Sequence, residues 1–470
     1  MNVFRPAYQA ALLFAVAFGG QSVALAQRDD DIQALREQIR QLDQKLRILE
    51  RNQELKDETA TAAAKTASKL TASDGRVEIA SGDGATSLRL RGLVQADYRY
   101  YEAANDAPDT FLLRRARLIF EGKFAKNYQY VIQPEFGGTI QILDAYVSVG
   151  LSPALQVRVG KFKTPLGLEQ LQSDPVAFFN ERSVATGLVP NRDTGLQVSG
   201  DVLDNRLNYA VGVFNGVPDG GNNVTGATDF DSNKTFVARI FATPFANDKE
   251  SPLNGLGFGI AGSIGDFETV AGRAANYRTD GQQAFFTYLT STTLPSDNVV
   301  AVGRGVTYSP QAYYYRGPFG LLAEYVVSSL DVQRGAGRIA EVNNYGYNLS
   351  FGYVLTGEDS SYRGVSPKTV FNPSGGTWGA FEVVARVSGL DIDDTVFTGP
   401  ATLRLANSNV SATSLTAYGV GLNWYLSKSV RAGFDIFQNE FKLAPSATPA
   451  PNALIADDET TFISRLQLFF

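Results

Sequence analysis

The last twelve residues of the chain, Glu459 to Phe470, alternate in polarity and end on an aromatic residue with no polar tail. Side chains alternate across a strand, so this stretch has one apolar and one wetter face. The apolar face carries Phe462, Leu466, Leu468 and Phe470, and the other carries Thr461, Arg465 and Gln467, with Ile463 and Phe469 as apolar exceptions. An ordinary buried C-terminal strand would fit. An exposed apolar edge invites aggregation, however, whereas a strand that closes a membrane barrel has no free edge.

The same period of two runs through the chain from Thr86 to the end, in a proposed barrel domain spanning 86–470. We predict strands near 86–101, 112–124, 126–136, 140–150, 154–163, 194–203, 206–215, 234–245, 255–267, 306–317, 318–331, 342–356, 378–392, 414–426, 429–442 and 459–470. An even strand number is usual for bacterial outer-membrane barrels. The expected fold is therefore an all-β membrane protein, an antiparallel barrel of about sixteen strands.

Charged residues lie opposite apolar ones along these strands. The basic members are Arg89, Arg91, Arg115, Arg117, Arg158, Arg386 and Arg431. In a soluble β-sandwich they would form the solvated outer face, but then Tyr98, Tyr100 and Trp424 would have to crowd into one core. In a barrel the aromatic residues take the two membrane interfaces and the charges line water in the lumen. The pattern favours the barrel.

Composition excludes several classes of function. The chain has no histidine and no cysteine, which rules out Ser-His-Asp hydrolysis, imidazole zinc sites and thiolate sites. An outer-membrane hydrolase is accordingly a disfavoured alternative, and we expect no cofactor and no metal. The net charge of -6 argues against a nucleic-acid binder. No apolar run reaches the roughly 18 residues of a spanning helix.

The N-terminal region has three parts with different patterns. Residues 1–26 predict a secretory signal peptide, with Arg5 before a short apolar stretch and Ala24-Leu25-Ala26 as the cleavage site. Residues 29–56 predict a coiled coil in the periplasm, with Ile32, Ile39 and Leu46 at a and Leu35, Leu42 and Leu49 at d. Self-association is favoured over one amphipathic helix packed on its own barrel. Residues 57–85 are expected to be a flexible spacer with a short strand at 76–80.

Two long intervals, 164–193 and 268–305, lack the strand pattern. We expect the first to fold into the barrel, because its apolar residues need burial. These residues are Leu166, Leu168, Leu171, Phe178 and Phe179.

Several motifs resemble the phosphate-selective porin O/P family of bacterial outer membranes. They are Leu113-Arg114-Arg115-Ala116-Arg117-Leu118, Gly160-Lys161-Phe162-Lys163-Thr164-Pro165, Asn180-Glu181-Arg182, Pro190-Asn191-Arg192-Asp193, Ala323-Glu324-Tyr325, Leu355-Thr356-Gly357 and Gly421-Leu422-Asn423-Trp424-Tyr425. The resemblance covers roughly 88–470. It implies a sixteen-stranded barrel, usually a trimer, with the third loop in the channel and a ladder of arginines along the passage.

The resemblance also implies particular site residues. Arg114 and Arg115 match a pair of arginines in the ladder, and strand parity places Arg114 at a bulge or a strand start. The chain departs from the family at two positions: Pro175, beside Asp174, stands where the third-loop lysine is expected, and Leu93 replaces an arginine of the first strand, with Arg91 two positions away.

We therefore expect an outer-membrane porin for passive diffusion of small anions such as phosphate or polyphosphate. The predicted pore-lining set is Arg89, Arg91, Arg114, Arg115, Arg117, Arg158, Lys161, Lys163, Arg386 and Arg431. Arginine binds oxyanions through two parallel hydrogen bonds, and several moderate sites allow an ion both to enter and to leave. Asp97, Glu121 and Asp144 are expected to hold arginines in place. The alternatives are a weakly selective general porin and a structural protein tethered through its coiled coil.

Overall fold

The computed structural model describes residues 24–73, 76–102, 108–217, 231–270, 274, 276–291, 294, 297–445, 447–450 and 453–470. The chain divides into two compact units, 1–67 and 68–470. The predicted signal peptide lies outside the described residues except for 24–26, which begin the first helix.

The first unit contains one long helix, α1 (Ala24–Thr66). Both rows of its predicted seam are exposed in the single chain, from 46% at Ile32 to 66% at Leu49. Surface ion pairs such as Arg47–Asp43, at 3.1 Å, join successive turns of the helix. The helix continues past the heptads because residues 60–65 are mostly alanine, the strongest helix former.

The stretch expected to be a flexible spacer is therefore ordered in large part. It is helical to Thr66 and then forms a hairpin of β1 (Lys69–Ser73) and β2 (Arg76–Ala80), the second of which was predicted as a short strand.

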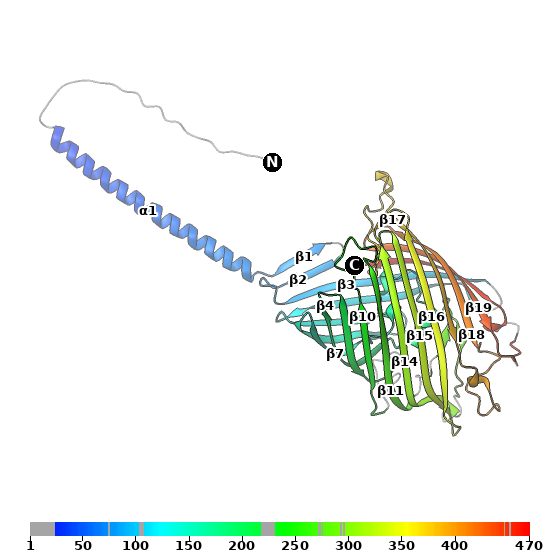
Figure 1. Ribbon diagram of the computed structural model, residues 1–470. Coiled ribbons are helices and arrows are strands. Elements are labelled where there is room, and N and C mark those ends of the chain that lie inside the picture. Colours follow the sequence, from blue (N-terminus) through cyan, green and yellow to red (C-terminus); the bar gives the residue numbers. More distant parts are fainter. Residues whose placement is uncertain are drawn as a thin grey trace. The chain divides into compact units, whose positions relative to one another are not determined.

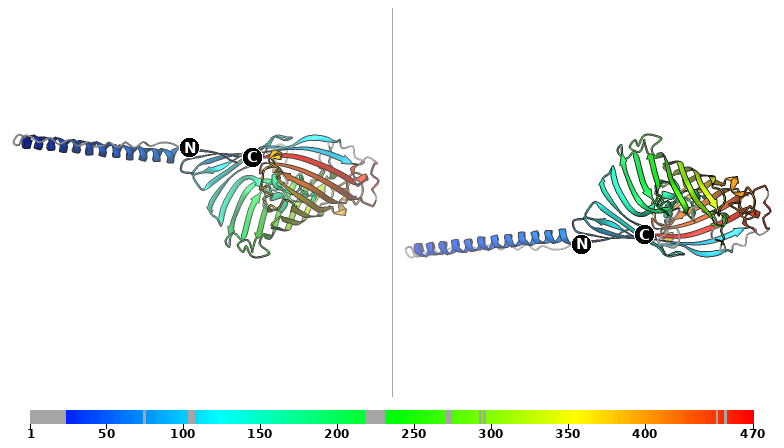
Figure 2. Two further views of the ribbon diagram at one scale, coloured as in Figure 1. Left: turned by 90° about the horizontal axis from the view of Figure 1, so that it is seen from above. Right: turned by 90° about the horizontal axis from the view of Figure 1, so that it is seen from below.

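The second unit is a closed antiparallel barrel of sixteen strands, as predicted (Figures 1 and 2). The strands are β3 (Ser87–Glu102), β4 (Thr110–Phe124), β5 (Tyr128–Glu135), β6 (Gln141–Ser152), β7 (Leu155–Lys163), β8 (Arg192–Val202), β9 (Leu207–Phe214), β10 (Thr235–Ala242), β11 (Leu256–Val270), β14 (Val299–Arg316), β15 (Phe319–Arg334), β16 (Ala340–Val354), β17 (Ala380–Asp391), β18 (Ser414–Tyr425), β19 (Val430–Lys442) and β20 (Glu459–Phe469). A further pair, β12 (Tyr277–Arg278) and β13 (Ala284–Phe286), forms a separate small sheet.

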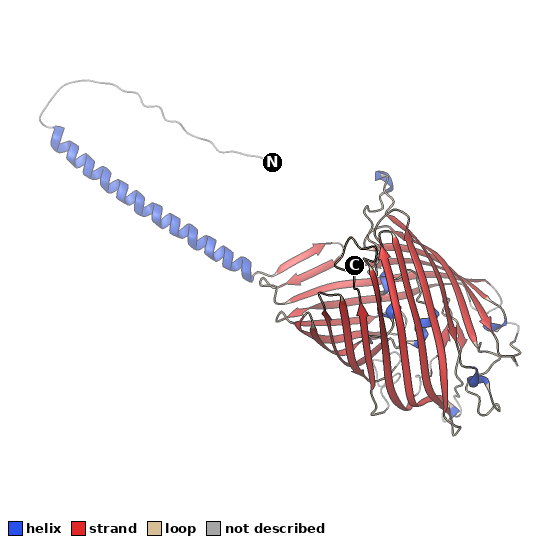
Figure 3. Cartoon of the chain, in the orientation of Figure 1, coloured by secondary structure: helices blue, strands red, loops and turns tan. Residues whose placement is uncertain are grey.

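The connections define two ends of the barrel. The turn end carries 125–127, 153–154, 203–206, 243–255, 317–318, 355–379 and 426–429, together with the C-terminus. The loop end carries the other connections, including the third loop, residues 164–191, whose short helical segments are α2 (Leu168–Leu171), η1 (Asp174–Val176) and η2 (Val184–Leu188) (Figure 3).

The barrel wall has an apolar outer face and a polar inner face. In β20, Leu466 is 59% exposed while its neighbour Arg465 is 3% exposed, and the alternation repeats along the strand. This is the arrangement of a wall with lipid outside and water or polar loops inside. No helix in the described part of the chain is both long and apolar enough to cross a membrane.

The barrel closes where β20 pairs with β3. Gly92 and Phe470 exchange two backbone hydrogen bonds, of 2.8 and 3.1 Å. The first residues of β3, which extend past the end of β20, are paired on the same edge with β2, where Val77 faces Leu90. The edge of β3 therefore stays hydrogen-bonded along its length.

The third loop folds into the barrel, as expected from its apolar residues. Leu166, Leu168 and Phe179 are at most 2% exposed. Part of the second long interval is buried as well, since Phe285 and Phe286 have no exposed surface. Apolar burial thus directs both intervals inward.

Gly160 of β7 has a φ of +130°, and a Cβ there would lie 2.2 Å from the backbone oxygen of Ala145. We expect Gly160→Ala to lower the free energy of unfolding of the barrel by about 1–3 kcal/mol, because strand β6 cannot move away without breaking its pairing. The midpoint of heat-induced unfolding in detergent, followed by gel mobility, measures this.

Gly150→Ala is the matched control, since its Cβ would meet only the backbone oxygen of Asn127, at 3.9 Å. Equal midpoints for the two variants would contradict the assignment of strain to Gly160.

Candidate functional site

The third loop is attached to the inner wall by buried hydrogen bonds. On β18, Asn423 donates to the backbone oxygen of Phe178 at 2.7 Å. On β19, Asp435 accepts from the backbone nitrogen of Asn180 at 2.7 Å. Glu324 of β15 accepts from the backbone nitrogens of Leu168 and Glu169, at 2.8 and 3.1 Å, and Gln467 of β20 donates to the oxygen of Pro175 at 3.0 Å. Four strands thus fix one loop.

Two acids of this loop pair with five arginines of the wall. Glu181 accepts from Arg114 at 2.7 Å, from Arg99 at 2.7 Å and from Arg465 at 2.8 Å. Its side chain is only 3% exposed. Three guanidinium groups on β3, β4 and β20 therefore share one carboxylate.

Asp174 is the second such acid. It pairs with Arg115 at 3.6 Å, with Arg182 at 2.6 Å and with Arg117. Burial alone would raise the pKa of Asp174, but these guanidinium groups hold that pKa well below its usual range. Asp174 stays ionised and neutralises part of the arginine ladder.

Arg114 reaches the inner side of the barrel through a β-bulge. Strand parity predicted that it would lie either at a bulge or at the start of a strand. Gln95 faces Arg115 and Ala96 faces Leu113, so Arg114 is the extra residue of β4. A bulge re-aims one side chain, and here it lets consecutive arginines reach two different loop acids.

Arg386 and Arg431 are buried against the loop. Arg386 donates to the backbone oxygen of Glu181 at 2.9 Å, pairs with Asp280, and stacks 4.4 Å from the ring centroid of Phe179. Arg431 donates to the backbone oxygen of Ala177 at 2.7 Å. Both side chains hold the loop to the wall.

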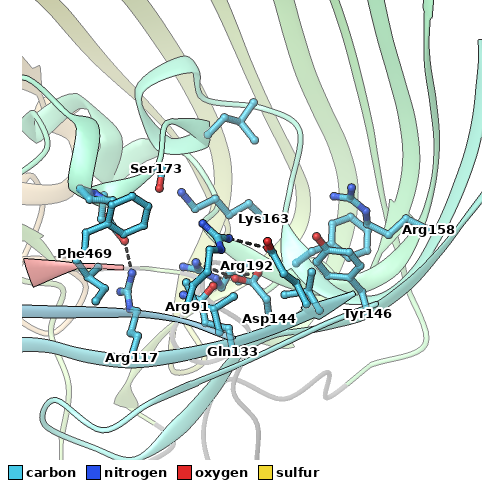
Figure 4. A pocket seen from close by; sticks show the side chains of 18 residues that line it. Arg91, Arg117, Gln133, Asp144, Tyr146, Arg158, Lys163, Ser173, Arg192 and Phe469 are labelled. Atoms are coloured by element: carbon cyan, nitrogen blue, oxygen red, sulfur yellow. Dashed lines mark hydrogen bonds and ion pairs between the residues drawn. The ribbon is translucent and has the colours of Figure 1, made fainter. Parts of the chain in front are cut away.

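A cavity of about 290 Å³ remains between the third loop and the wall formed by β3 to β8 (Figure 4). It is lined by Arg91, Leu93, Arg117, Ile119, Glu121, Val131, Gln133, Asp144, Tyr146, Arg158, Phe162, Lys163, Leu171, Ser173, Asp174, Pro175, Arg192 and Phe469. Five of these side chains are basic and three are acidic, so the lining has a formal excess of two positive charges.

Two basic groups of the cavity form no ion pair among the described residues. Arg158 donates to the hydroxyl of Ser148 at 3.1 Å and lies 4.4 Å from the ring centroid of Tyr146. Lys163 donates to the backbone oxygens of Gln170 and Gln172, at 2.7 and 2.9 Å. Neither side chain is paired with a carboxylate. These two basic groups therefore account for the excess of two positive charges in the lining.

The predicted set is thus divided by the structure. Arg91, Arg117, Arg158 and Lys163 line the cavity, and Arg114, Arg115, Arg386 and Arg431 bind the loop. Arg89 pairs with Glu78 and Glu121, at 2.9 and 3.3 Å, in a separate cavity. Lys161 is buried but is not among the residues that line the cavity.

The acids expected to hold arginines do so. Glu121 pairs with Arg91 at 2.7 Å, and Asp97 pairs with Arg465 at 2.6 Å. Asp144 pairs with Arg192 at 3.1 Å.

Sequence reasoning left several residues out of the site: Arg99, Arg182, Arg192 and Arg465, and the anchoring roles of Asp174 and Glu181. Strand parity is a signal that marks Arg99 and Arg465, whereas nothing local marks which loop acid each arginine meets. No group of acids placed to hold a metal ion occurs in the described ranges.

Comparison with known proteins identifies the same family that the sequence motifs resemble. A family model described as "Phosphate-selective porin O and P" matches residues 88–460. Porin O of Pseudomonas aeruginosa is 25% identical over 431 residues, which cover 84% of this chain and 91% of porin O.

Among solved structures, outer-membrane expressed OmpT of Vibrio cholerae has a TM-score of 0.51 at 10% identity, covering 86% of this chain and 100% of that chain. A loop L8 deletion mutant of OmpT also gives 0.51, at 11% identity and 82% coverage of this chain. At these identities the likeness concerns the barrel fold. The family model spans well over half of the sequence, and the chain belongs to the phosphate-selective porin O and P family.

Proposed function

We propose that this outer-membrane protein is a channel for passive diffusion of small anions, phosphate among them, with modest selectivity. The observation that carries the proposal is the cavity beside the third loop, whose five basic and three acidic side chains leave an excess of positive charge. The family description, which names phosphate, agrees with this substrate class.

The mechanism follows from the charges that have no carboxylate partner. These groups are Arg158, whose guanidinium group belongs to the cavity lining, and Lys163, whose amino group is held by two backbone oxygens. Together they raise the local concentration of anions and offer weak, exchangeable binding. The other arginines of the cavity are compensated by Glu121, Asp174 and Asp144. No single position therefore binds an anion so tightly that it blocks flow.

A weakly selective general porin is the second candidate, and one observation favours it. Asp174 stands beside the position where the resemblance leads us to expect a third-loop lysine, and it pairs with three arginines. A negative charge at this position lowers the anion-to-cation permeability ratio. The two candidates differ in degree, so a measured permeability ratio separates them.

We also propose that α1 associates with α1 of other copies in the periplasm, within a trimer. Six apolar side chains at strict heptad spacing are exposed in the single chain: Ile32, Leu35, Ile39, Leu42, Leu46 and Leu49. Such a seam is stable in water only when another helix covers it. A solved OmpT structure of Vibrio cholerae is described as a trimer, which is compatible with this number of copies. The helix could also tether the barrel to a partner in the periplasm while the barrel conducts ions.

Asp174→Asn should raise the anion-to-cation permeability ratio. The change leaves Arg115, Arg117 and Arg182 with one less negative charge among them. One unit charge acting over ~10 Å of water changes the energy of each ion by about 0.4 kcal/mol, with opposite signs for anion and cation, so the ratio changes about fourfold. The reversal potential of single channels in a planar bilayer across a KCl gradient measures it.

Asp204→Asn is the matched control, because it removes the same charge from an exposed turn whose side chain is 87% accessible. Arg158→Gln should shift the ratio in the opposite direction. An unchanged ratio in both Asp174→Asn and Arg158→Gln would show that this cavity does not set selectivity. Heat-dependent gel mobility verifies that each barrel is folded.

The chain contains no cysteine, so a single introduced thiol reports on helix pairing. We expect Ile39→Cys, at an a position, to form a disulfide-linked dimer under mild oxidation in the outer membrane. Gln41→Cys, on the opposite side of the same turn, is the control and should stay monomeric on a denaturing gel. Equal cross-linking at both positions would contradict a specific seam, as would none at either.

A further inference from the structure

A larger cavity, of about 970 Å³, lies where the third loop, the inner wall around β10 and β14 and the connection 355–379 meet. The cavity beside the third loop that carries the basic excess is much smaller, at about 290 Å³. Sites for small organic molecules usually enclose about 300–1,000 Å³. The larger cavity therefore has room for a molecule of the size of a disaccharide.

Five aromatic side chains follow one another along this part of the interior. The ring centroid of Phe241 in β10 lies 5.1 Å from that of Tyr313 in β14. Tyr313 in turn lies 5.4 Å from Tyr315 and 5.4 Å from Tyr362 of the connection 355–379. Phe178 of the third loop continues the row, at 6.0 Å from Tyr315. The row joins two wall strands, the third loop and a turn-end connection.

The members of this row differ in what surrounds them. Phe178 and Tyr315 are each 8% exposed and are not part of the cavity lining, so packing of the third loop against the wall accounts for them. Tyr313 and Tyr362 do line the cavity, and both are only half-buried. Their rings stack on each other with an angle of 22° between the ring planes. The stacked pair therefore leaves aromatic surface toward the cavity.

This pair is held rigidly on one side and has a free polar group on the other. The hydroxyl of Tyr362 donates to the backbone oxygen of Leu168 at 2.6 Å, and its backbone oxygen accepts from Gln172 at 2.9 Å. The hydroxyl of Tyr313 forms no hydrogen bond within the part of the chain that the structure describes. A fixed aromatic surface with one hydroxyl to spare can bind a partner that has both apolar and polar faces.

Uncharged polar side chains complete the lining. Asn205, Asn208 and Thr243 belong to it, from the turn-end connections after β8 and β10 and from the start of β9. Amide and hydroxyl groups both donate and accept hydrogen bonds, which matches the two roles of a ligand hydroxyl group.

The charged side chains of the lining are in part committed to protein partners. Arg91 pairs with Glu121 at 2.7 Å, and Arg239 donates to Gln311 at 2.9 Å. Asp201 accepts from the amide of Asn208 at 2.9 Å. Arg76 and Arg363 are the other charged members of the lining. The site proposed below makes no use of any of these charges.

We propose that this cavity binds the ring of an uncharged carbohydrate. One face of a pyranose ring consists of C–H groups, which can stack on the aromatic surface of Tyr313 and Tyr362. The hydroxyl groups at the edge of the ring would meet Asn205, Asn208 and Thr243. A ligand without charge goes beyond the anion conduction proposed above and does not depend on it.

The test is calorimetric titration of the folded full-length protein with maltose, in a detergent whose headgroup is not a sugar. We expect saturable binding with a dissociation constant on the order of 1 mM, since few contacts offset the cost of ordering the ligand. Sorbitol is the comparison solute, because it has the same kind of hydroxyl groups but no ring. It should give no saturable heat.

The variant Tyr313→Ala should weaken maltose binding roughly tenfold, because it removes half of the stacking surface. Tyr313→Phe keeps the ring and should bind within about threefold of the unaltered protein. Tyr314→Ala is the matched control, since Tyr314 is the next residue of the same strand, on the opposite face of the sheet and outside the cavity lining. Heat-dependent gel mobility verifies that each variant is folded.

Three results would each overturn the site: no saturable binding of maltose, equal binding of sorbitol, or unchanged binding in folded Tyr313→Ala. The titration involves no ion flow. A protein that conducts no anions but binds maltose as described would contradict the proposed function and leave this site standing, so the two failures are distinguishable.

Discussion

The constraint on which this structure depends is that a membrane-spanning sheet cannot leave backbone groups unpaired in lipid. Each unpaired peptide group costs several kcal/mol there, so the sheet must close. Here the closure is the pairing of β20 with β3, finished by the exchange of hydrogen bonds between Phe470 and Gly92. The β1–β2 hairpin extends this principle, because it pairs the part of β3 that lies beyond the C-terminus.

Closure produces an interior, and the way this interior is filled determines the chemistry. Arginine is too costly to bury alone, so each buried guanidinium must meet an acid or carbonyl groups. The third loop supplies both, through Asp174, Glu181 and the backbone oxygen of Ala177. Most of the arginine ladder is therefore structural. In the cavity beside the third loop, Arg158 and Lys163 are the basic groups that form no ion pair among the described residues.

Much of the fold is predictable from the sequence because barrel strands carry a period of two. All sixteen strands were placed within a few residues, apart from an earlier start of β14. The inward third loop was predictable for a related reason, since Phe178 and Phe179 need burial. Residues 57–66 are helical and not the flexible spacer that the sequence predicts: they carry no heptad, but the alanines within 60–65 favour helix.

The site was less predictable, because its ion pairs join residues far apart in the chain. Arg465 and Glu181 are separated by 284 positions, and no local pattern links them. Strand alternation also fails to predict which way a side chain points where the backbone is irregular. The bulge at Arg114 turns inward a side chain that simple alternation puts outside.

The central claim is that the compensated arginine ladder leaves a modest excess of positive charge along the pathway. The most direct test is the reversal potential of the unaltered protein in a planar bilayer across a KCl gradient. The account predicts an open channel whose reversal potential lies on the anion side but well short of the value for pure chloride permeability. A cation-selective reversal potential, or a folded barrel that conducts no current, would contradict it.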